Sequence, residues 1–158
     1  MNGWGTWSAS WIWSLAIVAI TIAIHVVGIV FVGNTSRRAR NRLLRQGFAF
    51  VDNPASTIVL IVVVALSLAV LHAIEAMVWA LVYVKLGALP TPAAAALYSV
   101  DSITTRGASG LVPDQQWRMM GATEAGDGML LFGLSTAFLF YVMLHLWKDE
   151  SQNASPTD

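Results

Sequence analysis

Hydrophobic residues along the chain are gathered in three long runs, which polar segments separate from one another. The runs are Trp11–Gly33, Thr57–Val84 and Met129–Trp147. Each is close to the roughly 20 residues that a helix needs to span about 30 Å of hydrocarbon. Because lipid offers the backbone no hydrogen-bonding partner, such runs are expected to be helical. The pattern therefore predicts three membrane helices.

Composition favours a membrane protein over a soluble domain. Hydrophobic residues make up 56% of the chain and charged residues only 11%, whereas soluble domains carry about 25% charged residues. The chain has no cysteine, so disulfides and thiolate metal sites are excluded. Its net charge is zero and its basic residues gather between two hydrophobic runs, so we expect no nucleic-acid partner.

A basic cluster sets the predicted orientation. It lies between the first and second runs and contains Arg37, Arg38, Arg40, Arg42 and Arg45. Positively charged loops stay in the cytoplasm, so we expect the N-terminus outside and the C-terminus inside. Residues 36–56 are interpreted as a cytoplasmic linker. They serve only as this topology signal, or they form a short helix, capped by Ser36, that lies on the membrane lipids.

The segment between the second and third runs has the pattern of a re-entrant loop. Pro92 suits the first turn of a helix and the alanines after it propagate one, which predicts a helix over 92–104. Twelve or so residues give about 18 Å of helix, which is too short to span the bilayer. The small, polar residues 104–110 that follow are expected to be irregular. Irregular backbone at membrane depth must be buried by protein or line water.

Two segments of the sequence resemble bacterial potassium channels of the type with two helices and one pore loop. Ser99-Val-Asp-Ser-Ile-Thr-Thr-Arg-Gly-Ala-Ser-Gly110 is similar to the family's pore helix and filter, S-V-E-T-A-T-T-V-G-Y-G-D. Gly128-Met-Leu-Leu-Phe-Gly-Leu-Ser-Thr-Ala137 is similar to the family's inner helix, G-I-T-S-F-G-L-V-T-A. The resemblance covers about residues 57–148.

Together with the three hydrophobic runs, the resemblance implies a fold and a division of the chain. The first membrane helix is not part of the family's pore module, and we expect it to pack on the periphery of the assembly. The fold would be all-α, with three transmembrane helices and a re-entrant pore helix, assembled as a homotetramer in the bacterial inner membrane. Its parts would be an N-terminal membrane helix (1–35), the linker (36–56), a pore module (57–148) and a polar cytoplasmic tail (149–158). The pore module would comprise an outer helix (57–86), a pore helix (92–104), a filter-like loop (104–110) and an inner helix (124–148).

By the same resemblance, particular residues would take part in ion conduction. The filter-like loop would consist of Thr104, Thr105, Arg106, Gly107, Ala108, Ser109 and Gly110. Gly128 would be the hinge of the inner helix, and Met129, Phe132 and Thr136 would line its cavity. Backbone carbonyls would replace the hydration shell of a permeant monovalent ion, so we expect no cofactor and no resident metal.

The loop departs from the family's filter, T-V-G-Y-G-D, at four positions. Arg106 replaces the valine, Ala108 replaces the tyrosine that packs behind the filter, and Gly110 replaces the aspartate. Ser109 replaces a glycine whose φ is positive, a conformation that serine would adopt only at a cost. These changes predict weak or altered potassium selectivity.

Arg106 has two interpretations. The family's valine points away from the ion path, and Asp101 lies five residues earlier, on the pore helix. An Arg106–Asp101 pair would neutralise two buried charges and support the filter, whereas an unpaired buried arginine costs at least about 3 kcal/mol. Alternatively, four Arg106 side chains would ring the lumen and repel cations.

Ionisable residues within the hydrophobic runs are candidates for polar contacts. His72 and Glu75 are three residues apart and share one face of the predicted helix. We expect them to brace that helix against the pore helix, for example at Tyr98, or against Arg118. The alternative is that they sense pH.

The remaining ionisable residues are expected to make structural contacts and not to take part in a reaction. Glu124 and Asp127 are expected in the outer polar zone, where they could pair with Arg106 or Arg118. His25 stands alone on an apolar helix, and we expect it to pack there through a hydrogen bond. No set of these residues has a spacing that indicates a metal site.

Two functions remain open. The chain would be a cation channel with altered selectivity, or a channel-derived scaffold or auxiliary subunit that does not conduct. Assembly with another channel subunit is compatible with both. An enzyme is not expected: Gly107-Ala-Ser-Gly110 is similar to the G-x-S-G pattern of rhomboid proteases, but that chemistry needs a histidine base on a neighbouring helix and belongs to a fold of six or more helices.

Overall fold

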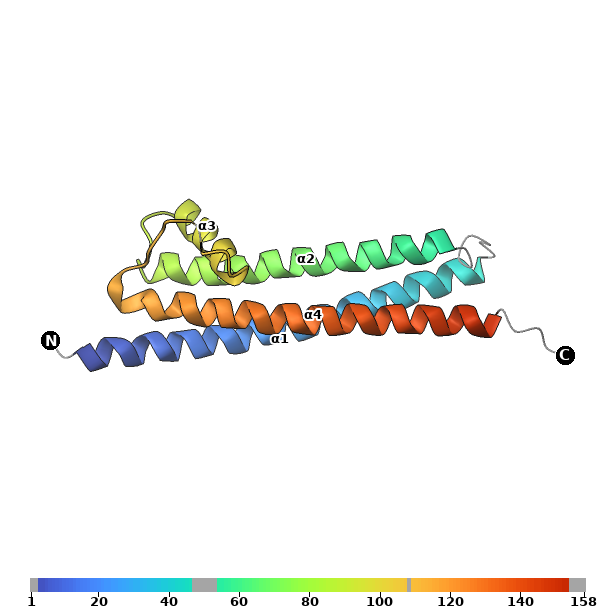
Figure 1. The fold of residues 1–158 in the computed structure, drawn as a ribbon, viewed down its shortest axis with the longest axis horizontal. Coiled ribbons are helices and arrows are strands. Elements are labelled where there is room, and N and C mark those ends of the chain that lie inside the picture. The colour runs from blue at the N-terminus through green and yellow to red at the C-terminus, as the bar shows by residue number, and fades with distance from the viewer. Residues whose placement is uncertain (1–2, 47–53, 108, 154–158) are drawn as a thin grey trace. The chain divides into compact units, whose positions relative to one another are not determined.

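The computed structural model of the protein describes residues 3–46, 54–107 and 109–153. These residues form four α-helices and one short 3-10 helix, and no strand (Figure 1). The helices are α1 (Gly3–Arg45), α2 (Pro54–Lys85), α3 (Pro92–Ile103), η2 (Gln115–Trp117) and α4 (Arg118–Asn153).

Three of the helices contain segments that are long and apolar enough to cross a membrane, which confirms the prediction from the hydrophobic runs. The segments are Ser10–Leu43, Ala55–Lys85 and Gln115–Leu146. Large apolar side chains on them face outward, among them Val27 at 68% and Phe31 at 69% exposure. Apolar surface on this scale belongs against lipid or other protein.

α1 is longer than the sequence predicts. It continues through the basic cluster to Arg45, so Ser36 lies inside it, and the prediction that Ser36 caps a separate helix is wrong. After Gly33 this part of the helix holds neither glycine nor proline, and its arginine, alanine and leucine residues are good helix formers. Residues 47–53 of the predicted linker lie outside the described residues.

α4 is also longer than predicted, at both ends. It begins at Arg118 rather than at 124, directly after the 3-10 turn, and extends to Asn153, into the segment predicted as a tail. Residues 154–158 of that tail lie outside the described residues. The early start places Glu124 and Asp127 inside the helix instead of at its outer end.

α3 is close to its predicted range, because its ends carry clear capping signals. The Thr91 hydroxyl accepts a hydrogen bond of 3.1 Å from the backbone N–H three residues on, and Pro92 takes the first helical position, where its missing N–H costs nothing. The helix ends at Ile103. Thr104 follows it and donates its hydroxyl to the carbonyl of Val100 at 2.6 Å.

The chain divides into two compact units, which we describe separately. The first comprises Met1–Val26 and Leu71–Gly133, and the second comprises Val27–Val70 and Leu134–Asp158. α3 and the loop that follows it lie wholly within the first unit. The second unit holds a groove of about 240 Å³, lined mainly by apolar residues of α1 and α4 together with Arg37 and Arg40.

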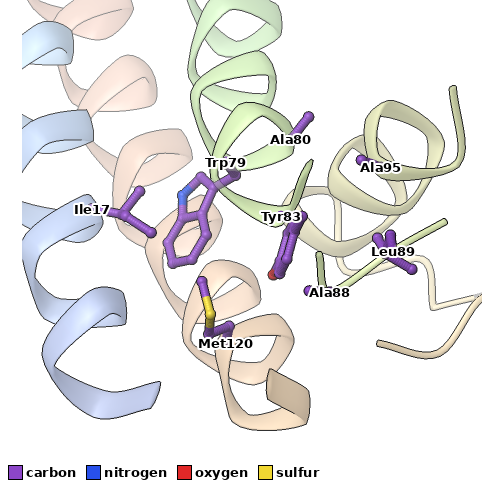
Figure 2. Close-up of a cluster of buried hydrophobic side chains, with 8 residues drawn as sticks. All are labelled: Ile17, Trp79, Ala80, Tyr83, Ala88, Leu89, Ala95 and Met120. Atoms are coloured by element: carbon purple, nitrogen blue, oxygen red, sulfur yellow. The ribbon is translucent and has the colours of Figure 1, made fainter. Parts of the chain in front are cut away.

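Apolar side chains from all four α-helices meet in the core of the first unit (Figure 2). Trp79 and Tyr83 of α2 are fully buried there. Trp79 points toward Ile17 of α1 and Met120 of α4, and Ala95 brings α3 into the same cluster. Close van der Waals packing of this kind is what holds helices together in lipid, so this cluster packs α3 against the long helices.

Gly128 allows α4 to approach the end of α3 closely. A Cβ at this position would overlap the carbonyl oxygen of Ile103 and lie 2.9 Å from its carbonyl carbon. Backbone atoms that end a helix cannot move aside as a flexible side chain can. The packing of α3 on α4 therefore requires a glycine at this position. This requirement does not depend on the predicted role of Gly128 as a hinge.

We expect Gly128→Ala to destabilise the protein by about 1–3 kcal/mol, the usual effect of overpacking a close contact. Gly126→Ala on the same helix is the matched control, because a Cβ there has no neighbour within 4 Å. The control should be neutral or stabilising by up to about 1 kcal/mol through helix propensity. Denaturant unfolding of the detergent-solubilised protein measures both, and equal effects would contradict the packing role of Gly128.

Candidate functional site

The loop that follows α3 has an unusual backbone. Positive φ angles occur at Thr105 (57°), Gly107 (62°) and Gly110 (69°). Glycine adopts this region freely, whereas Thr105 does so at a cost of about 1–2 kcal/mol. Ser109, which aligns with a glycine of positive φ in the family's filter, does not adopt a positive φ; the neighbouring Gly110 does, at no steric cost. Ala108 lies outside the described residues.

Asp101, in the last turn of α3, holds this loop in place. Its Oδ1 accepts a hydrogen bond of 2.5 Å from Nε of Arg106, and its Oδ2 accepts one of 2.6 Å from the backbone N–H of Ser109. Its backbone carbonyl accepts a further bond of 2.9 Å from the N–H of Arg106. The side chain and the backbone carbonyl of Asp101 therefore bind the loop to the end of α3 at both Arg106 and Ser109.

The predicted pair of Arg106 and Asp101 is present, although it differs in detail from the expectation. The Asp101 side chain is 3% exposed, but that of Arg106 is 63% exposed, so only one of the two charges is buried. The pair is made through Nε of Arg106 alone, and the second oxygen of Asp101 accepts the N–H of Ser109. Arg106 is thus anchored at Nε, while much of its guanidinium group faces outward.

These contacts also set the protonation of Asp101. Burial alone would raise its pKa, but the hydrogen bonds from Ser109 and Arg106 to the charged carboxylate outweigh burial, and the pKa lies below its usual value of 3.8. The carboxylate therefore remains ionised, and remains a hydrogen-bond acceptor, at any ordinary pH.

An open groove of about 440 Å³ lies against the loop. Asp101, Thr105, Gly107 and Ser109 line it on one side, and Tyr98 of α3 lines it further along. The side chains that the loop presents to this space are small.

Glu124 lies at the junction of three helices, and its predicted pairing with Arg106 or Arg118 is wrong. It is fully buried on α4. Its Oε2 accepts a hydrogen bond of 2.8 Å from the Tyr83 hydroxyl of α2, and its Oε1 contacts the Ser99 hydroxyl of α3. Ser99 also lies 2.6 Å from the carbonyl oxygen of Ala76.

Asp127 is likewise buried, at 2% exposure, and its predicted pairing with Arg106 or Arg118 is wrong. Its Oδ2 accepts hydrogen bonds of 2.6 Å from the Thr21 hydroxyl of α1 and 3.0 Å from the Trp79 indole of α2. The carboxylate joins three helices of the first unit. The sequence offered one signal for this contact: a carboxylate inside an apolar helix must find partners within the protein.

His72 and Glu75 share one face of α2 as predicted, but their partner is a third residue. Oε2 of Glu75 lies 3.1 Å from Nδ1 of His72, and its Oε1 lies 2.7 Å from Nδ1 of His25 on α1. The predicted bracing against Tyr98 or Arg118 is thus replaced by a contact with α1. His25 packs through a polar contact, as expected, and the ring of Phe132 stacks on His72 at 4.1 Å.

The residues expected to line a cavity are accessible in the single chain. Met129 is 63% exposed and Phe132 is 41% exposed, both in the first unit. Thr136, in the second unit, is exposed as well. Gly128 is buried against Ile103.

The chain was compared with family models, with curated proteins and with solved structures, and none of them matches it. The geometry of the site therefore carries the functional argument.

We expect Asp101→Asn to lower the thermal unfolding midpoint of the protein at neutral pH, because the loop loses its anionic anchor. The folded-state pKa of Asp101 is depressed, so its stabilising contribution is fully present above the usual pKa and is lost as the pH falls through the folded-state pKa. The difference between wild type and variant should therefore be constant at neutral and mildly acidic pH and should shrink only in strong acid.

Asp114→Asn is the matched control for this measurement. Asp114 is exposed and makes no side-chain capping bond, so the exchange should leave the midpoint unchanged. Unfolding is followed by tryptophan fluorescence in detergent. A midpoint of Asp101→Asn equal to that of Asp114→Asn at neutral pH would show that the contacts of Asp101 do not stabilise the fold.

Proposed function

We propose that the chain is the subunit of a potassium-channel-like pore, a homotetramer that conducts monovalent cations passively. The observation that carries the proposal is the order of α2, α3, the loop 104–110 and α4. A short capped helix, too short to span a bilayer, runs into a polar loop between two helices that are long enough to span one. Such an arrangement brings irregular backbone to a place where it can line water.

The contacts of the loop support a role in coordinating ions. Conduction without a covalent step requires backbone carbonyls at fixed positions, where they replace the hydration shell of an ion. Asp101 fixes the loop through Arg106 and Ser109, and the core under α3 is fixed by Tyr83 and Glu124. These bonds fix the backbone, and with it the carbonyls, at the described residues next to Arg106 and Ser109.

The exposed face of α4 supports assembly around a central path. One chain supplies one loop, and four loops are needed to surround an ion. Met129 and Phe132, three residues apart on α4, present apolar surface that a single chain leaves open. In the proposed tetramer this face lines the cavity below the filter.

The proposed topology follows from the basic cluster. Arg37, Arg38, Arg42 and Arg45 are exposed on α1, and loops or helix ends rich in arginine remain in the cytoplasm. The N-terminus then lies outside, the C-terminus lies inside, and the loop 104–110 faces the outer side of a bacterial plasma membrane. Anionic lipids of the inner leaflet are the expected partners of the cluster.

Arg106 bears on the choice between cations and anions. Its Nε is bound to Asp101, so the arginine carries its own counter-charge, and a ring of four such pairs is electrically neutral. This pairing supports cation conduction over an anion-selective or closed pore. A channel-derived subunit that does not conduct is the competing function.

Reconstitution of the intact tetramer into liposomes tests the proposal. We expect flux of K⁺ and Na⁺ but not of Cl⁻, with a ratio of K⁺ to Na⁺ flux on the order of one, because the loop lacks the residues that hold a potassium filter at fixed diameter. Arg106→Gln should retain cation flux. A dominant Cl⁻ flux that disappears in Arg106→Gln would place the arginine in the lumen instead.

The oligomeric state is measured on the same preparation by native mass spectrometry. A tetramer that shows no flux of any of the three ions, at any voltage and from acidic to alkaline pH, would contradict conduction and favour the scaffold. A stable monomer in liposomes would contradict the pore itself. Liposomes without protein give the leak that must be subtracted.

A further inference from the structure

Three buried ionisable side chains meet inside the first unit, at a place that the proposed pore does not use. They are His25 of α1 and His72 and Glu75 of α2, with exposures of 0%, 9% and 0%. Each can offer one ligand atom, and the three atoms lie within 4.8 Å of one another. Sequence spacing alone hides the group, because fifty residues separate His25 from Glu75.

The distances within the group, from 2.7 Å to at most 4.8 Å, bracket those of ligand atoms around one small ion. Nδ1 of His25 lies 2.7 Å from Oε1 of Glu75, and Nδ1 of His72 lies 3.1 Å from Oε2. Metal–ligand bonds of about 2.0–2.2 Å place neighbouring ligand atoms about 3–3.5 Å apart. Small side-chain rotations would therefore direct all three residues at a common centre.

We propose that His25, His72 and Glu75 bind a divalent first-row transition-metal ion, with Zn²⁺ as the reference case. Two imidazoles and one carboxylate suit such an ion, whereas Mg²⁺ and Ca²⁺ prefer sets made only of oxygen. Three protein ligands leave a further position for water. The bound ion would join α1 to α2 inside the first unit, whether or not the protein conducts.

The charge around the group favours a divalent cation. Two neutral imidazoles and Glu75 carry one negative charge, and the buried carboxylate of Asp127 interacts electrostatically with both His25 and Glu75. Among the described residues, Oδ1 of Asp127 has no hydrogen-bond partner. Two buried carboxylates and one divalent ion are neutral together, and a neutral set is what an apolar interior tolerates.

The second histidine separates a metal site from a plain ion pair. A single protonated His25 would already neutralise Glu75, and such a pair has no need of another imidazole. His72 nevertheless places Nδ1 3.1 Å from the same carboxylate, outside hydrogen-bond geometry, and its ring stacks on Phe132.

The experiment uses full-length protein in detergent, purified without a polyhistidine tag and stripped of metal by a chelator. Titration with Zn²⁺, followed by calorimetry and elemental analysis, should give one ion per chain. Co²⁺ should produce visible d–d absorption of a four- or five-coordinate site, and Zn²⁺ should displace it. X-ray absorption of the Zn²⁺-loaded wild type should show two imidazole ligands, a readout that depends on no variant.

Variants test which residues bind. His72→Gln keeps a polar side chain but removes a ligand. Loss of a group that only supports a ligand weakens metal binding about 10–100-fold, so this variant should weaken Zn²⁺ binding by more than that and should lose the Co²⁺ absorption. His145→Gln is the matched control, because this exposed histidine lies on α4 in the second unit and should leave binding unchanged. Helical content by circular dichroism verifies that both variants fold.

Three outcomes would overturn the proposal. Wild-type protein could bind less than one ion per chain at micromolar Zn²⁺. X-ray absorption could show no imidazole at the bound ion. His145→Gln could lose binding while a folded His72→Gln retains it. Each of these would leave the group as an ion pair between helices.

Discussion

Buried carboxylates hold the first unit together, and the position of every other functional group depends on them. A carboxylate in an apolar interior is tolerated only when it is paired or hydrogen-bonded. Glu124 meets this requirement through Tyr83 and Ser99, so one side chain of α4 binds both α2 and α3. Asp127, one turn further along α4, binds Thr21 and Trp79 and thereby adds α1. Removing one hydroxyl or indole partner of such a set is expected to destabilise by about 1–3 kcal/mol, because a buried polar group is left without its hydrogen bond.

The same principle operates at the surface of the unit in a weaker form. Asp101 ends α3 with a buried carboxylate, and its partners come from the loop that follows, not from another helix. α3 therefore determines the conformation of the loop through contacts between residues that are only five and eight positions apart in the sequence. Glu124 holds α3 against the core through Ser99. Because the loop is attached to α3, the core also determines where the loop lies.

Local features of this structure were predictable from the sequence, and long-range pairings were not. The three apolar runs, the Pro92 start of α3 and the Arg106–Asp101 pair each depend on residues close together in the chain. The partners of Glu75 and Asp127 come from α1, 50 and 106 residues away, and no periodicity encodes such a match. The one usable signal was the presence of ionisable residues within or beside the apolar runs, which implies partners but not their identity. The length of α1 was missed because arginines that signal topology are also good helix formers.

Arg106 also limits where the loop can lie. An arginine that faced hydrocarbon would cost at least about 3 kcal/mol, and its side chain is 63% exposed even with Asp101 bound to it. The apolar faces of α1 and α2 are compatible with lipid, but the outer side of this guanidinium group is not. The loop must therefore meet water or the polar surface of another protein chain.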